Sequence, residues 1–95
     1  MITEIAIFNA LPGKEDELGQ AILHGLDSIR KHPGCISSQV QRCIEQPNQY
    51  ILTNLWISLD AHMQDFRSSA LFTEWRGHIK GLFEENPTVF HTQPF

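Results

Sequence analysis

The side chains with the widest chemical range in this sequence are its five histidines, which can transfer protons or bind metal ions. They are His24, His32, His62, His78 and His91. No two of them form an HxxH or HxxxH pair, and no carboxylate or cysteine lies at a spacing that would complete a ligand set. The sequence therefore predicts no metal site, and we expect His24, His32 and His91 to be structural or to lie at the surface.

Motifs for cofactors and for nucleophiles are also missing. Pro12-Gly13-Lys14 is a turn into a helix, not a phosphate loop, and neither GxSxG nor a Cys–His signature occurs. Haem, flavin and nicotinamide sites have no motif to support them, so we expect no cofactor. What remains is a set of polar and aromatic residues on one side of the expected sheet, chiefly between Asn54 and His62.

The elements that must position these residues follow from the pattern of apolar positions. Apolar residues at three- and four-residue spacing predict a helix over 14–32, which Pro33-Gly34 ends. Ser58 can cap a short helix to about Phe66, and Ser68-Ser69 can cap another that continues to about Glu85. Strand patterns occupy residues 2–10, 35–45, 49–57 and 88–93.

The strand over 49–57 has apolar residues on both of its faces. Tyr50, Leu52, Asn54 and Trp56 share one face, whereas Ile51, Thr53, Leu55 and Ile57 share the other. The order βαββαβ favours a ferredoxin-like α+β sandwich, an antiparallel sheet with two helices on one face. Because the helices can cover only the Trp56 side, we expect the Leu55 side to pack on a second copy and to form a dimeric α+β barrel.

Length and charge narrow the class of protein. The 95 residues suit one domain, 1–95, and the net charge of −4 with scattered Lys and Arg argues against binding to nucleic acid or to an anionic membrane. No apolar run approaches the roughly 20 residues that span a bilayer, and the N-terminus does not resemble a signal peptide. The spacing of Cys35 and Cys43 suits neither zinc nor a redox pair, so we expect reduced thiols and a cytoplasmic location.

Several segments spread along the chain carry a family resemblance. They are the turns Pro12-Gly13-Lys14 and Pro33-Gly34-Cys35, the strand end Leu55-Trp56-Ile57-Ser58 with Ala61-His62, and Phe66-Arg67-Ser68-Ser69. In these segments the chain resembles the antibiotic biosynthesis monooxygenase (ABM) family. The resemblance implies the same dimeric α+β barrel. It also implies one of several activities, among them oxidation of polycyclic phenols or quinols by O₂ without metal or flavin.

The resemblance also implies roles for individual residues. Trp56 falls at the family's pocket tryptophan, and Arg76 falls where the aromatic-polyketide monooxygenases carry an arginine, which could stabilise a phenolate or peroxide anion. His62 takes the place of a tyrosine and could exchange a proton with the substrate. The subgroup's asparagine is replaced by Leu52, and Asn54, on the same strand face as Trp56, could substitute for it.

The resemblance leaves other functions open. Haem degradation ranks low, because the axial histidine of that subgroup aligns with Arg76, and His78 lies about 200° around the helix from it. A non-catalytic or isomerase-like protein that binds small molecules is the main alternative to a cofactor-independent monooxygenase. Trp56 could also be an ordinary core residue, and Arg76 could be a surface residue paired with Glu74 or Glu85.

Overall fold

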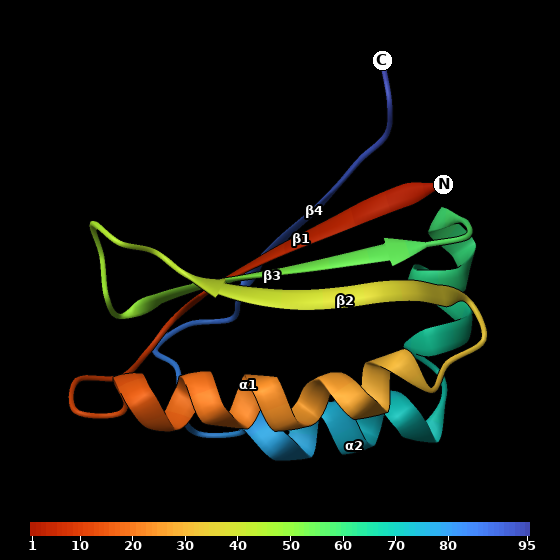
Figure 1. The fold of residues 1–95 in the computed structure, drawn as a ribbon. Coiled ribbons are helices and arrows are strands. Elements are labelled where there is room, and N and C mark those ends of the chain that lie inside the picture. Colours follow the sequence, from red (N-terminus) through yellow and green to blue (C-terminus); the bar gives the residue numbers. More distant parts are fainter.

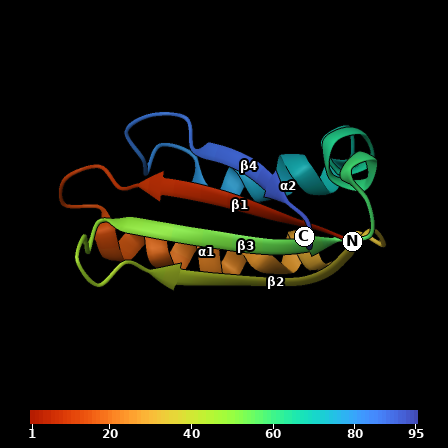
Figure 2. The same cartoon turned by 90° about the horizontal axis from the view of Figure 1, so that it is seen from above.

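A computed structural model describes residues 1–95. Four strands and two main helices follow one another in the predicted order (Figure 1). Their bounds are β1 Ile2–Asn9, α1 Glu15–Arg30, β2 Cys35–Arg42, β3 Gln49–Trp56, the π-helix η1 Ala61–Phe66, α2 Ala70–Ile79 and β4 Thr88–Thr92. The strands form one antiparallel sheet in the order β2-β3-β1-β4, and both main helices lie on the same face of it (Figure 2). This is the ferredoxin-like α+β fold that the sequence predicts.

The covered face of the sheet forms the core together with α1. In β3 the side chains of Tyr50, Leu52, Asn54 and Trp56 are buried, whereas the residues between them are partly exposed. The helix α1 contributes an apolar stripe at helical spacing to the same core, namely Leu18, Ile22, Leu26 and Ile29. The two faces of β3 therefore have the different environments that the sequence predicts.

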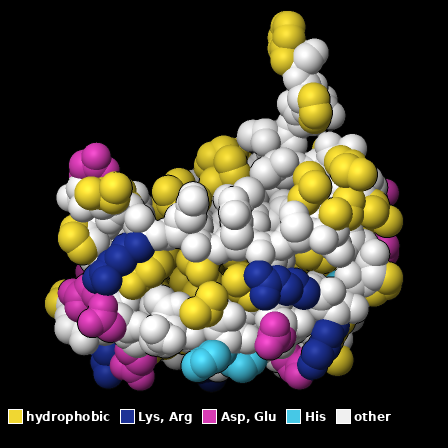
Figure 3. Space-filling model, viewed as in Figure 1, with side chains coloured by type: hydrophobic (Ala, Val, Ile, Leu, Met, Phe, Trp, Pro, Cys, Tyr) yellow, Lys and Arg dark blue, Asp and Glu magenta, His cyan; other side chains and the backbone are white.

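The opposite face of the sheet has no helix over it. Ile5 and Ile7 of β1 and Ile51 and Leu55 of β3 are partly exposed there, and Phe90 of β4 is 43% exposed. Figure 3 shows hydrophobic side chains along the upper, sheet side of the molecule, while most charged side chains lie on the lower, helical side. We call the sheet surface formed by Ile5, Ile7, Ile51, Leu55 and Phe90 the open face.

Several predicted boundaries and one predicted cap differ from the structure. The strand predicted over 35–45 ends at Arg42. The last helix ends at Ile79 instead of near Glu85, because Gly81 adopts a φ of +81° that an α-helix cannot accommodate. Leu82 and Phe83 follow the helix and still pack against the core. Ser69 stands at the start of α2, but its hydroxyl donates to the carbonyl of Phe66 and does not cap the helix.

The helices α1 and α2 approach each other closely at Gly25. A Cβ atom at this position would lie 2.7 Å from Cε3 of Trp75, which is too close for two carbon atoms. The absence of a side chain therefore sets the distance between the helices and seats Trp75 in the core. None of the helices is long and apolar enough to cross a membrane.

Candidate functional site

A buried carboxylate, Glu4, lies at the centre of the covered sheet face. In β1 it shares that face with Ala6 and Phe8, and its side chain is only 8% exposed. The antiparallel register places Asn54 of β3 on one side of Glu4 and His91 of β4 on the other. The sheet therefore brings three polar side chains from different parts of the sequence into one row.

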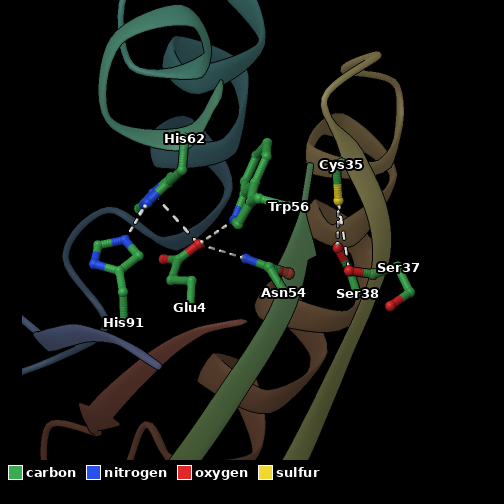
Figure 4. A network of polar contacts seen from close by, with 8 residues as sticks. All are labelled: Glu4, Cys35, Ser37, Ser38, Asn54, Trp56, His62 and His91. Carbon is green, nitrogen blue, oxygen red and sulfur yellow. Dashed lines mark hydrogen bonds and ion pairs between the residues drawn. The ribbon is translucent and has the colours of Figure 1, made fainter. Parts of the chain in front are cut away.

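One oxygen of Glu4 receives three nitrogen contacts, and the three lines meet at this atom in Figure 4. Glu4 Oε1 accepts hydrogen bonds from Asn54 Nδ2 at 3.0 Å and from Trp56 Nε1 at 2.9 Å, and His62 Nε2 lies 3.3 Å away. A buried carboxylate is stable only with such partners. Trp56 and Asn54 therefore hold Glu4 in one orientation.

His62 connects this carboxylate to the edge of the sheet. Its side chain is 4% exposed, and its ring stacks on Trp56 with the ring centroids 5.0 Å apart and places Nδ1 2.8 Å from Nε2 of His91. Burial lowers the pKa of His62 to about 4, and the positive charge of Arg67 and the neighbouring His91 act in the same direction against the opposing effect of Glu4. At neutral pH the ring is therefore uncharged, and the nitrogen that carries its one proton decides whether His62 donates to Glu4 or to His91.

The π-helix η1 places His62 over the sheet. Ser58 accepts a hydrogen bond from the N–H of Ala61 at 3.1 Å, which fixes the start of the segment. The N–H of Arg67 donates to the carbonyl of His62 at 3.4 Å, a step of five residues. Wide turns of this kind are rare in proteins, and those that do occur are often found at functional sites. It brings His62 and Phe66 together against Trp56.

A cavity of about 380 Å³ opens beside this network. Glu4, Asn54 and His62 form its polar side, and the apolar wall includes the aromatic rings of Phe8, Phe66, Phe72, Trp75 and Phe83. Its volume falls within the roughly 300–1,000 Å³ of pockets that bind small molecules. The predicted pocket wall, Trp56, does not line the cavity but lies behind His62, where it is fully buried and donates to Glu4.

Two exposed arginines, Arg67 and Arg76, line the same cavity. Neither forms an ion pair, so the pairing of Arg76 with Glu74 or Glu85 that the sequence left open does not occur. The guanidinium of Arg76 lies 5.8 Å from the centre of the Phe72 ring. Both charges are therefore free to attract an anionic group of a ligand.

Asn54, which was predicted to substitute for the family's asparagine, lies in the site and forms a hydrogen bond with Glu4. Its amide nitrogen donates to Glu4, so its Oδ1 turns away from that carboxylate and has no hydrogen-bond partner (Figure 4). Leu52, at the family's asparagine position, is buried and lines the cavity. This part of the wall is therefore apolar.

Sequence reasoning brings together Asn54, Trp56, His62 and Arg76 but misses Glu4, Arg67 and His91. The available signal for Glu4 was its position among apolar residues on the covered face of a strand. His91, predicted to be structural or superficial, instead contacts His62. No sequence pattern indicates this contact, because it depends on the pairing of β4 with β1. No three histidine, cysteine or carboxylate side chains lie together in an arrangement that could hold a metal ion.

Comparisons with known proteins agree with this fold. The model of the antibiotic biosynthesis monooxygenase family matches residues 1–77. A crystal structure from Bordetella bronchiseptica, provisionally named as such a monooxygenase, superimposes with a TM-score of 0.93 at 36% identity, over 99% of this chain and 96% of that one.

Two further relatives are more distant. The uncharacterized Bacillus subtilis protein YczJ is 29% identical over 98% of both chains. The Mycobacterium tuberculosis protein Rv0793 has a TM-score of 0.81 at 19% identity, over 99% of this chain and 94% of that one, and shows the shared fold alone. From the family match and the similarity to the Bordetella protein, the chain belongs to the antibiotic biosynthesis monooxygenase family.

Proposed function

We propose that this protein is a monooxygenase that uses O₂ to oxidise a small phenolic or quinol-type aromatic without metal or flavin. The observation that carries the proposal is the cavity itself, which combines aromatic walls with a buried acid–base network and two unpaired arginines. Such a pocket can bind a flat ring, remove its phenolic proton and hold the resulting anion away from water.

The reaction follows from the electron-rich character of a phenolate. The anion gives one electron to O₂, and the radical pair combines to form a peroxide on the ring carbon opposite the phenolic oxygen. Loss of water breaks the O–O bond, so that one oxygen atom of O₂ becomes the new quinone carbonyl and the other leaves as water. O₂ takes up the electrons that the ring loses, and no other oxidant or reductant is required.

Each predicted residue has a place in this scheme. Arg76, together with Arg67, stabilises the phenolate or the peroxide anion by charge. His62, uncharged and directed at Glu4, exchanges the proton. Asn54 and Trp56 act from behind the cavity, because both donate to Glu4 and fix its orientation.

We further propose that the single domain, 1–95, works as a cytoplasmic homodimer. Two open faces packed together would bury Ile5, Ile7, Ile51, Leu55 and Phe90 and would close a barrel with two-fold symmetry. The support is the partial exposure of an apolar sheet face that no element of the chain covers.

Oxygen uptake with a panel of naphthols and hydroquinones tests the proposed function. We expect product formation above the buffer rate in air and none under argon, and a large loss of activity in Arg76→Gln. Lys80→Gln, which removes a charge just after the same helix but outside the cavity, is the control. Turnover no faster than in buffer for the whole panel would exclude the proposed oxidation.

A non-catalytic or isomerase-like binding protein is the second candidate. The observation in its favour is Leu52, which places an apolar side chain where the phenol-oxidising subgroup has a polar one. Thermal shift with the same aromatic panel separates the two functions: a ligand that stabilises the protein but is not oxidised supports the second.

A further inference from the structure

The two oxygens of the Glu4 carboxylate have different surroundings. Oε1 accepts from Asn54 and Trp56 and lies beside His62. Oε2 forms no hydrogen bond with the protein, although Glu4 lines the cavity. A carboxylate with one oxygen fixed by donors presents the other at a constant position. Oε2 is therefore the atom of this site best placed to take a proton from a bound ligand.

A chain of ring nitrogens leads from this carboxylate to the edge of the sheet. His62 Nε2 lies 3.3 Å from Glu4 Oε1, and His62 Nδ1 lies 2.8 Å from Nε2 of His91. His91 belongs to β4, the edge strand next to β1, and it is only partly buried. The last nitrogen of the chain, His91 Nδ1, has no partner in the protein. The buried carboxylate is thus connected to the surface through two imidazole rings.

We propose that Glu4 is a catalytic base and that His62 and His91 exchange its proton with solvent. The site then catalyses proton transfer to and from enolisable aromatic compounds, an activity that requires no O₂. This inference rests on the proposed function only for the class of ligand, a ring compound that exists as a phenol or as its keto form.

The proton balance of this chain requires no charged histidine as an intermediate. The C–H bond of the keto form breaks, its electron pair enters the ring as the enolate, and the proton goes to Glu4. With both rings protonated on Nδ1, a half-turn of the carboxyl group, which exchanges its two oxygens, brings that proton to His62 Nε2. The Nδ1 proton of His62 then passes to His91 Nε2, and the Nδ1 proton of His91 passes to water. Both rings are left protonated on Nε2, and a solvent proton that returns along the same chain to Glu4 restores the first tautomers. Protonation of the enolate oxygen completes the conversion of ketone to phenol without oxidation.

Deuterium exchange into anthrone, the keto form of a polycyclic phenol, tests this activity. Wild-type protein in D₂O under argon should exchange the methylene protons faster than buffer does, as measured by mass spectrometry. Glu4→Gln should lower the enzymatic rate by about 100-fold or more, as expected for loss of a general base. Glu74→Gln, which changes an exposed carboxylate outside the cavity, should exchange at the wild-type rate.

His91→Gln tests the connection to solvent. This variant keeps a side chain that can donate to His62 but cannot pass a proton on. We expect slower exchange in a weakly buffering solution and recovery when imidazole is added, which a purely structural defect would not show. His24→Gln, an exposed histidine on α1, should be unaffected. If Glu4→Gln does not fold, as judged by circular dichroism, Glu4→Asp and His91→Gln decide the question.

The outcomes distinguish this inference from the proposed oxidation. Exchange under argon without O₂ uptake in air would support the proton-transfer activity and remove the oxygenase. O₂ uptake that persists in Glu4→Gln would overturn the role of Glu4 and leave the oxygenase standing. Wild-type exchange no faster than buffer would contradict the proton-transfer activity. A His91→Gln defect that imidazole does not relieve would contradict the exchange of protons with solvent through His91.

Discussion

At the scale of single residues, the unusual feature of this chain is a carboxylate inside an apolar strand. Removing Glu4 from water carries a large desolvation penalty, which the N–H groups of Asn54 and Trp56 offset. The aromatic ring of Trp56 therefore has two tasks, since it fills the core and also supports a charge. A tryptophan is usually interpreted either as a core residue or as part of a site. Trp56 is both, because it is buried in the core and donates to Glu4.

The hydrogen bond from Trp56 can be separated from its packing by substitution. Trp56→Phe keeps an aromatic ring but removes the donor to Glu4, and a hydrogen bond to a charged group contributes about 1.5–3 kcal/mol. Trp75→Phe is a matched control, because Trp75 is 5% exposed but its indole nitrogen makes no hydrogen bond. In urea denaturation we expect the free energy of unfolding to fall further for Trp56→Phe, by about the value of that bond. Equal losses would mean that packing alone accounts for Trp56.

The low pKa of His62 predicts a pH dependence of stability. The charged groups that face the ring are Glu4 from β1 and Arg67 at the end of η1, and the titratable His91 faces it from β4. Between pH 6.5 and about 4, the unfolded chain binds a proton at His62 that the folded chain does not. The free energy of unfolding should therefore decrease as the pH falls through this window, by on the order of 3 kcal/mol.

Urea denaturation at pH 7 and pH 4.5 measures this effect. In His62→Gln the free energy of unfolding should fall less between pH 7 and pH 4.5 than in the wild type. In His24→Gln it should fall as much as in the wild type. Identical pH dependence in wild type and His62→Gln would show that burial does not lower the pKa of His62.

The residues of the site differ in how far sequence could reveal them. Strand alternation places Asn54 on the same face as Trp56, whereas the site roles of Trp56, His62 and Arg76 follow from the family resemblance. In the sequence, Glu4 is only a charged residue within an apolar strand. Its role cannot be predicted from the local pattern, because its partners lie about 50 positions away along the chain. His91 is brought to His62 only by the crossover that pairs β4 with β1, and local patterns carry no information about that pairing.

At the scale of elements, the contact between α1 and α2 depends on Gly25, which lies within the helix predicted over 14–32. Gly25→Ala would place a methyl group against Trp75, and overpacking of this kind costs about 1–3 kcal/mol. Gly77→Ala is the matched control, since nothing lies within 4 Å of a Cβ atom at that position. There the gain in helix propensity should stabilise the protein by about 0.5–1 kcal/mol.

Thermal denaturation of both variants measures the difference. We expect the melting temperature to fall for Gly25→Ala and to rise for Gly77→Ala. A rise for both would mean that Trp75 moves aside easily and that Gly25 does not set the helix distance. The sequence predicted both helices but not this contact, because amphipathic spacing identifies the buried side of a helix and not its distance to a neighbour.

At the scale of the whole molecule, the two faces of the sheet have different environments. The covered face holds the cavity and the polar contacts around Glu4, while the open face presents apolar side chains to solvent. This division was predictable, since alternation in residues 49–57 places Trp56 and Leu55 on opposite sides and the helix count leaves one side uncovered. The cavity was not predictable, because its volume depends on how the aromatic rings between sheet and α2 pack.

Leu55→Asp tests the proposed dimer through one apolar side chain of the open face. A charge within an apolar interface should separate the subunits, so sedimentation at micromolar concentration should show a dimer for wild type and a monomer for the variant. Ile44→Asp is the control, because Ile44 is 89% exposed and lies in the turn between β2 and β3. A Leu55→Asp protein that sediments as wild type does would rule out this face as the interface.

The π-helix η1 also bears on how this architecture can diversify. Its wide turn contains one residue more than an α-helix would need, and the exposed Gln64 lies within it. Loss of one residue between His62 and Phe66 would close this wide turn to the 3.6 residues per turn of an α-helix and would change the direction of one ring relative to the other. Phe66 could stay in the core while His62 left Glu4, and no strand or main helix would have to change. A deletion of one codon can thus remove the imidazole from the pocket while Glu4 stays, which makes this segment a point where descendants of one ancestor can acquire or lose the proposed proton transfer.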